Sequence, residues 1–158
     1  MALLHLAQNT MSARAPPHHA ATRMLAGCGL WLVALGLYFI FLRPPLLPED
    51  TRFMGSSLAQ VQVVLPGLEV WLKRVFTVMG GFIAGTGVLT VFVARVAMPS
   101  GLKGASWALA LTGVLTVVLM SATHFALHSD FRWLLLVPAL VWLAGLIGYV
   151  VRQQRHRD

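Results

Sequence analysis

Charged residues are scarce in this sequence. Only 11% of its 158 residues are Asp, Glu, Lys or Arg, whereas a soluble domain is usually about 25% charged. Hydrophobic residues make up 58% of the chain, which leaves too little polar surface to cover a water-facing fold. The composition therefore excludes an ordinary soluble protein, and the length fits a single domain.

Signatures of catalysis and cofactor binding are absent as well. The sequence holds no P-loop, no G-x-S-x-G, no C-x-x-C and no pair of histidines in facing apolar runs that would ligate a haem. Its one cysteine, Cys28, lies inside an apolar run, which excludes an internal disulfide and is typical of a small core residue. We therefore expect no cofactor.

Acidic residues are few, and the formal net charge is +7. In a soluble protein such a charge can indicate nucleic-acid binding, but no stripe of Lys and Arg interleaved with aromatic residues is present. The basic residues instead flank apolar runs, where they orient a protein in a membrane. We expect contact with the lipid bilayer and none with nucleic acid.

Long apolar runs are what the sequence has in abundance. Each has the roughly 20 residues that a helix needs to cross the hydrocarbon core of a bilayer. None has a charged residue in its middle, which disfavours a proton-coupled pump. The sequence predicts an all-α integral membrane bundle of four transmembrane helices, with an interfacial helix between the first and second. The predicted spans are about 24–42, 75–95, 105–123 and 133–151.

Polar segments divide the chain around these spans. The side of the membrane that carries both termini would hold seven Lys and Arg residues and the opposite side five, and the C-terminal tail is strongly basic. Because Lys and Arg are retained in the cytoplasm, both termini are predicted to be cytoplasmic. The predicted segments are a disordered cytoplasmic arm (1–23), a membrane domain (24–151) with an external segment (43–74), and a basic cytoplasmic tail (152–158).

Small residues in the spans mark the candidate packing positions, because membrane helices associate by close backbone approach. The second span carries Gly81 and Gly85 as G-x-x-x-G. Packing inside the four-helix bundle is the favoured interpretation of this pair, and a seam with a second copy or a partner is the alternative. The other candidate packing residues are Thr112 and Thr116 in the third span and Gly145 and Gly148 in the fourth.

The external segment is predicted to be structured. Three prolines between 44 and 48 require an extended exit from the first span, and Asp50 or Thr51 is predicted to cap a short helix that ends at Gly55. Ser57 and Gln60 fit a capping box for a helix lying in the membrane interface, although the alternation over 61–63 is also strand-like. No helix breaker follows Pro66 before about Ala97, so one helix could cover that whole stretch.

Three sequence patterns carry a family resemblance. They are LPED-x-RFMG over 47–55, LPGL-x-x-WL over 65–72 and VF-x-VMGG over 75–81. Together they resemble an uncharacterised family of small four-span bacterial inner-membrane proteins, over roughly residues 43 to 95. The resemblance implies the four-span topology and a place in the bacterial inner (plasma) membrane, and it carries no activity.

Two clusters have residue types that could support chemistry. His124 and His128 share a helical face, a spacing that metal ligands use, and Asp130 follows them. Glu49 and Asp50 could serve as a general acid and base, or donate a further metal ligand if the loops meet. Interfacial histidines, helix caps and ion pairs are the simpler interpretation of all five residues, and we predict neither a catalytic nor a metal site.

These observations favour a non-enzymatic accessory, scaffold or partner-binding membrane subunit. Its partner surface is expected on the second span or on the external segment 43–74. One alternative is a small transporter or channel component with a polar path along Thr90, Thr112 and Thr116. The other is a membrane enzyme acting on a lipid or quinone at the outer face, which requires the carboxylates and histidines to converge.

Overall fold

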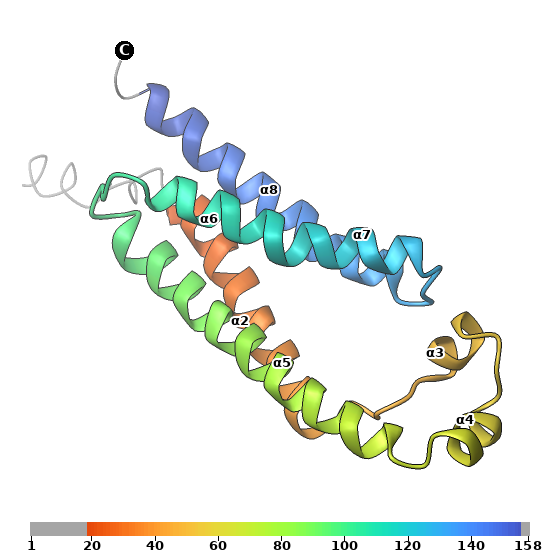
Figure 1. The fold of residues 1–158 in the computed structure, drawn as a ribbon. Helices are drawn as coiled ribbons and strands as arrows, with labels where there is room; N and C mark the ends of the chain where they lie inside the picture. The colour runs from red at the N-terminus through yellow and green to blue at the C-terminus, as the bar shows by residue number, and fades with distance from the viewer. Residues whose placement is uncertain (1–18, 156–158) are drawn as a thin grey trace, which may run out of the picture.

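The computed structural model describes residues 19 to 155, and every regular element within that range is a helix. The predicted spans correspond to four long helical stretches (Figure 1). The first stretch is α2 (His19–Phe41), and the second is α5 (Leu68–Phe92) with a π-helical end (Val93–Ala97). The third consists of α6 (Ala105–Gly113), a π-helical turn (Val114–Val118) and α7 (Leu119–Ala126). The fourth is α8 (Arg132–Arg155).

All four stretches are long and apolar enough to cross a membrane, which confirms the predicted all-α bundle of four membrane helices. The second is 30 residues long, from Leu68 to Ala97, as the lack of a breaker predicts. At 1.5 Å per residue it measures about 45 Å, whereas the hydrocarbon core is about 30 Å thick. α2 begins at His19, so residues 19–23 of the predicted arm are helical. Residues 1–18 of that arm lie outside the described residues.

Two short helices occupy the connection between α2 and α5: α3 (Pro48–Phe53) and α4 (Leu58–Val64). The capping box of α4 is confirmed, because Ser57 Oγ accepts the Gln60 N–H while Gln60 Oε1 accepts the Ser57 N–H. Residues 61–63 are therefore helical. The prediction for the α3 cap is wrong: the cap position is Leu47, and Asp50 lies one turn inside, where its carboxylate accepts the Leu47 N–H.

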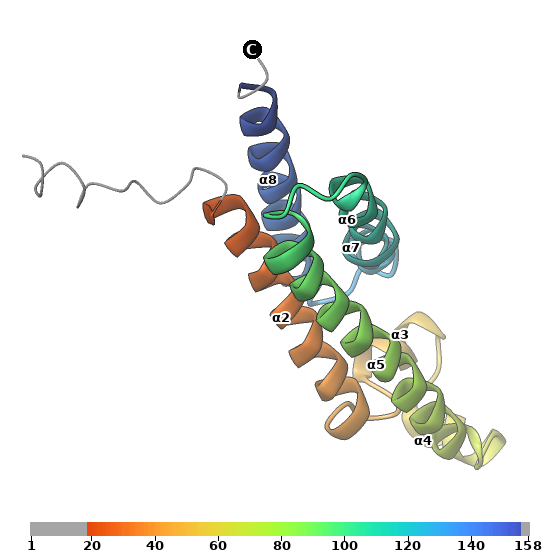
Figure 2. The ribbon, with the colours of Figure 1, turned by 90° about the vertical axis from the view of Figure 1, so that its left-hand side faces the viewer.

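The four long helices form two pairs that share one end. α2 packs along both α5 and α8, and α8 also packs against α6 and α7. The helices meet where α2 begins and α8 ends, which we call the termini end. They diverge toward the end that carries α3, α4 and the α7–α8 turn, which we call the long-loop end (Figures 1 and 2).

Glycines bring the backbones of α2 and α5 together. A Cβ on Gly36 would stand 2.5 Å from the Gly80 carbonyl oxygen, and one on Gly87 would stand 2.6 Å from the Gly29 carbonyl oxygen. Separations this short leave no room for any side chain. The contact between α2 and α5 is therefore backbone against backbone, the arrangement that small residues allow in membranes.

The favoured interpretation of Gly81 and Gly85 is wrong. A Cβ on either residue would meet no atom of the described chain within 4 Å outside its own helix backbone and immediate neighbours. Both residues are exposed, whereas the adjacent Gly80 and Gly87 are buried against α2. The G-x-x-x-G pair thus lies on a face of α5 that the bundle leaves open.

The other predicted packing residues also differ in whether they contact a neighbouring helix. Gly145 packs on Leu25 of α2, and Gly148 makes ordinary contact with Ala21. Thr112 and Thr116 are half-buried, and the Thr116 hydroxyl donates to the Thr112 carbonyl at 2.6 Å within its own helix. In the third span it is Gly113, between the two threonines, that receives a neighbour, because the indole of Trp142 lies directly on it.

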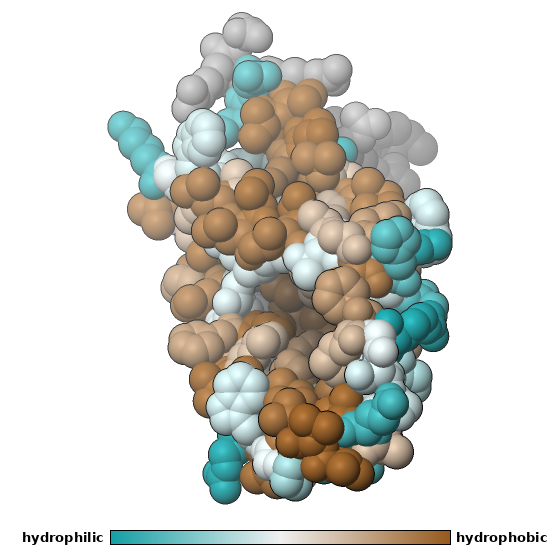
Figure 3. Space-filling view, turned by 45° about the vertical axis from the view of Figure 1, so that its right-hand side comes forward, coloured by the Kyte–Doolittle hydropathy of each residue, from teal (hydrophilic) through white to brown (hydrophobic). Residues whose placement is uncertain are grey.

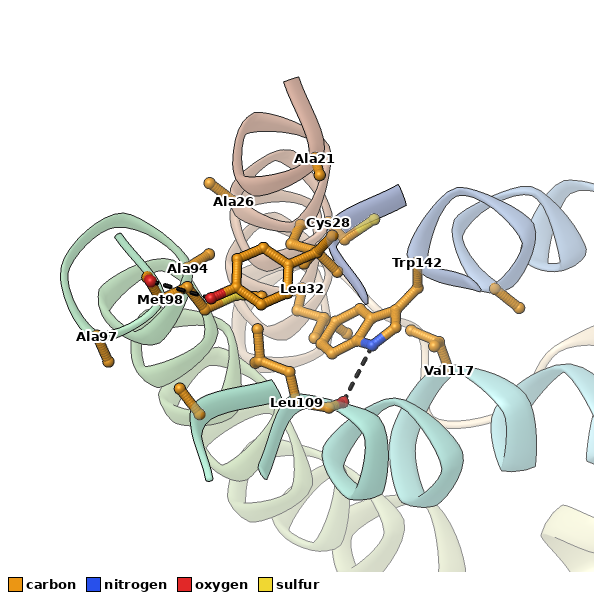
Figure 4. Close-up of a cluster of buried hydrophobic side chains, with 14 residues drawn as sticks. Ala21, Ala26, Cys28, Leu32, Ala94, Ala97, Met98, Leu109, Val117 and Trp142 are labelled. Atoms are coloured by element: carbon orange, nitrogen blue, oxygen red, sulfur yellow. Dashed lines mark hydrogen bonds between the residues drawn. The ribbon is translucent and has the colours of Figure 1, made fainter. Parts of the chain in front are cut away.

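Buried polar contacts fix α8 at the termini end (Figure 4). The Trp142 Nε1–H donates to the Leu109 carbonyl at 3.1 Å, and the Tyr149 hydroxyl donates to the Met98 carbonyl at 3.1 Å. These two bonds attach α8 to α6 and to Met98, which follows the π-helical end of α5. Leu25 and Cys28 of α2 belong to the same cluster of buried side chains.

Pro138 lies inside α8, where neighbouring helices accommodate it. Proline removes one backbone donor from α8, which weakens the carbonyl pairing one turn earlier. There the Ser121 hydroxyl of α7 donates to the Leu135 carbonyl at 2.7 Å, and the Cys28 thiol of α2 lies 3.8 Å from the Pro138 carbonyl. Two neighbouring helices thus supply donors around the proline.

The two glycine faces of α5 make a matched test of the fold. In a detergent that keeps the protein monomeric, Gly80→Val should lower the free energy of unfolding by about 1–3 kcal/mol, because the added side chain must separate two packed backbones. Gly81→Val should leave it nearly unchanged, because no neighbour opposes the new atoms. Thermal unfolding followed by circular dichroism measures both. An equal loss in the two variants would contradict this assignment of the faces.

Candidate functional site

The α2–α5 connection meets the α7–α8 turn at the long-loop end through Glu49. The carboxylate oxygen Oε2 of Glu49 accepts the Ser129 hydroxyl at 2.8 Å and the backbone N–H of Asp130 at 3.2 Å. Ser129 is only 2% exposed, and its hydroxyl also accepts the N–H of Phe131 at the start of α8. Glu49 therefore holds α3 against the beginning of the fourth span.

A second contact joins the same two segments on the surface. The Arg52 guanidinium lies 3.5 Å from both carboxylate oxygens of Asp130. Both side chains are about two-thirds exposed, so water screens the pair and it contributes about 0–1 kcal/mol. The part-buried hydrogen bond between Glu49 and Ser129 is the stronger part of this contact. We call the four residues Glu49, Arg52, Ser129 and Asp130 the clasp.

Arg43 fixes the other end of the connection. Its guanidinium lies 3.6 Å from the centroid of the Phe76 ring and 3.6 Å from the Asp50 carboxylate. The side chain is only 11% exposed, and a cation over an aromatic face gains more when it is desolvated. Arg43 thus attaches the chain leaving α2 to the first turns of α5, and through Asp50 to α3.

An apolar cavity of about 270 Å³ lies between these contacts. Figure 3 shows this face of the molecule hollowed in the middle, with apolar side chains around the hollow and hydrophilic residues along one edge. The cavity walls come from three parts of the chain: the α2–α5 connection with α3, the first turns of α5, and the end of α7. Its lining residues are Pro45, Leu46, Glu49, Asp50, Phe53, Met54, Leu68, Leu72, Phe76 and Leu127.

The sequence-predicted chemical residues are only partly brought together. Glu49 and Asp130 meet, but through the Asp130 backbone rather than its carboxylate. His124 Nδ1 lies 2.9 Å from the Met120 carbonyl of its own helix, and His128 is exposed in a left-handed turn conformation with φ 51°. Within residues 19 to 155 no group of three or more His, Cys, Asp or Glu side chains has the geometry to hold a metal ion.

The threonines of the predicted polar path differ in environment. Thr90 is 1% exposed, and its hydroxyl has no hydrogen-bond partner. Thr112 and Thr116 are half-buried on another helix, and the Thr116 hydroxyl is already satisfied by its own helix. The transporter and lipid-enzyme hypotheses both stay predictions.

One residue that organises the site was missed by the sequence analysis. Ser129 is a small polar residue in a turn, and its partner Glu49 lies 80 residues away, so no local pattern indicates the contact. The pairing of Arg43 with Asp50 agrees with the ion pairs expected for the acidic residues of this segment, whereas the contact of Arg43 with the Phe76 ring was not predicted.

Comparison of the chain with protein-family models, with curated proteins and with solved structures finds no match. The residues of the site therefore carry the functional argument alone.

The clasp can be tested through the stability of α3. Glu49→Ala leaves the buried Ser129 hydroxyl without its acceptor, which costs about 1–3 kcal/mol. The backbone amides of residues 49–53 should then exchange with solvent deuterium at least about fivefold faster, because the exchange rate reports local opening.

Glu69→Ala is the matched control, because Glu69 is a carboxylate of the same segment that binds the exposed Gln62 instead. It should leave exchange in α3 unchanged. The clasp is refuted if hydrogen-exchange mass spectrometry finds the two alanine variants alike in α3.

Proposed function

We propose that this protein is a non-enzymatic accessory or scaffold subunit of the bacterial inner (plasma) membrane. In this proposal it binds another membrane helix along the face of α5 centred on Gly81 and Gly85. The observation that carries the proposal is the open position of these two glycines, which face away from every other described helix. The bound helix belongs to a second copy of the chain or to a different membrane protein.

The burial of α5 supports this choice of face. Only 17% of its most apolar 18-residue window is buried inside the fold, compared with 28–33% in the other three spans. Val78, Phe82 and Leu89 are exposed around the two glycines. Large side chains beside a shallow small-residue groove form the surface on which two membrane helices interlock.

The external segment offers a second contact for the same partner. α4 has no buried residue, and its side chains Val63 and Val64 are among the most exposed apolar groups of the chain. α4 is linked to the start of α5 by the hydrogen bond from Gln62 to Glu69. A partner seated on α5 would therefore find apolar side chains on this segment at the long-loop end.

The enzyme alternative has less support from the same geometry. The oxygen of Glu49 that faces the turn is engaged by two donors, and Asp50 is engaged by the Leu47 N–H and by Arg43. A general acid or base needs a carboxylate within reach of a substrate proton. Carboxylates held in this way instead favour a structural role.

The binding face can be tested with copies carrying donor and acceptor fluorophores at their C-termini, reconstituted into vesicles. Gly85→Ile should weaken association roughly tenfold or more, because the added side chain must separate closely packed helices. Gly27→Ile is the matched control, since Gly27 is exposed on α2 with equally open space around it. Energy transfer measures association between copies.

The same variants distinguish a second copy from a different partner. If wild-type copies show no energy transfer, a stoichiometric membrane protein should co-purify in mild detergent at native expression and be lost in Gly85→Ile alone. The proposal fails if Gly85→Ile and Gly27→Ile behave like the wild type in both measurements.

Orientation supplies a separate test, based on cysteine labelling in intact cells. The wild-type thiol Cys28 is buried, so it gives little background. With both termini in the cytoplasm, Ser56→Cys should react with a membrane-impermeant maleimide in intact cells once the reagent reaches the periplasm. Gln154→Cys should react only after permeabilisation of the inner membrane. The reverse pattern would overturn the proposed orientation.

A further inference from the structure

The cavity at the long-loop end has the shape of a groove along one helix. Leu68, Leu72 and Phe76 line it from α5 at intervals of four residues. Residues spaced in this way lie above one another on a single helix face, and this row is about 12 Å long at 1.5 Å per residue. The other apolar lining comes from the α2–α5 connection with Leu46, from α3 and its C-cap with Phe53 and Met54, and from the end of α7 with Leu127.

The interior of the groove offers almost no free polar group to a ligand. Its two carboxylates already have partners: Glu49 is engaged by Ser129 and the Asp130 backbone, and Asp50 by Arg43 and the Leu47 backbone. The remaining lining residues are apolar. A ligand gains binding free energy here by burying hydrocarbon. The cavity volume of about 270 Å³ suits a segment of a hydrocarbon chain better than a large ring system.

A positively charged side chain belongs to α3, the short helix that lines part of the groove. Arg52 is adjacent in sequence to the lining residue Phe53, and it is two-thirds exposed beside Asp130. An exposed ion pair of this kind is weak, so a phosphate group can share or replace the carboxylate as the partner of the guanidinium. Arginine also binds phosphate in a bidentate manner.

The groove lies at the membrane depth where a lipid phosphate and the start of an acyl chain occur together. Trp71 and Trp133 are exposed at the first turns of α5 and α8, and tryptophan is enriched at the level of the lipid headgroups. Leu72 and Phe76 continue from that level toward the hydrocarbon. A lipid whose phosphate lies near Arg52 therefore has its chain beside the groove.

We infer that the groove binds one acyl chain of a membrane phospholipid, with the lipid phosphate paired to Arg52 and with α3, held by the clasp, covering the chain. The site is separate from the Gly81 and Gly85 face, so each can fail without the other. The clasp has a defined role in this arrangement, because it sets the distance between α3 and the walls from α5 and α7.

The test uses the full-length protein in phosphatidylglycerol vesicles that contain a small fraction of the same lipid with a photoreactive diazirine in one acyl chain. Mass spectrometry after illumination maps the labelled residues. Segments 45–54 and 68–76 should carry several-fold more label than 140–147 of α8, where Leu140, Leu143 and Ile147 are exposed away from the groove and from the Gly81 and Gly85 face.

Leu72→Trp fills the groove and should reduce labelling of 45–54 several-fold. Leu127→Trp should do the same from the end of α7, so a folding defect in one variant does not decide the result. Leu143→Trp is the control, because Leu143 is exposed on α8 away from both the groove and the Gly81 and Gly85 face. Arg52→Gln should reduce labelling by the phospholipid but not by a diazirine fatty alcohol, which has no phosphate.

The inference is overturned if 45–54 and 68–76 are labelled no more than 140–147. It is also overturned if Leu143→Trp lowers labelling of 45–54 as much as both groove-filling variants do. Equal sensitivity of the phospholipid and the fatty alcohol to Arg52→Gln would remove the role of the phosphate.

Discussion

The backbone contact between α2 and α5 is the constraint on which the rest of the structure depends. A bilayer gives two apolar helices no reason to associate through burial from water, so their association relies on close approach. Gly29 and Gly36 on α2 and Gly80 and Gly87 on α5 remove the side chains that would separate the two backbones. This pair forms a rigid unit, and α8 packs on the side of α2 that the pair leaves available.

The other pair, α8 with the α6–α7 stretch, is attached to the α2–α5 pair in a different way at each end. At the termini end, Trp142 and Tyr149 donate hydrogen bonds from inside the core to carbonyls of α6 and α5. Such bonds contribute about 0.6–2 kcal/mol each in a membrane protein, and they set the rotation of α8. At the long-loop end the helices diverge (Figure 1), and the connection between the pairs is made by Glu49 and Ser129 in the loops. The cavity exists because loops and not helices join the pairs there.

The sequence could predict those features that depend only on residues close together in the chain. The four spans, the capping box of Ser57 and Gln60 and the long helix of the second span all follow from neighbouring residues, and the structure has each of them. The packing face of α5 could not be predicted in this way, because the protein-facing and lipid-facing sides of a membrane helix are equally apolar. Contact between Glu49 and Ser129, 80 residues apart, likewise follows from the fold alone.

Two neighbouring glycines on α5 show that the helix face on which a residue lies indicates its packing role better than its residue type does. Consecutive residues of an α-helix point about 100° apart, so Gly80 and Gly81 belong to different faces although their side chains are identical. On the first face, a glycine is required because the α2 backbone occupies the space of a Cβ. On the second face, glycine relieves no contact within the described fold and has the poorest helix propensity after proline. A residue that lowers helix propensity without improving intramolecular packing supports the proposal that the second face binds a helix outside the monomer.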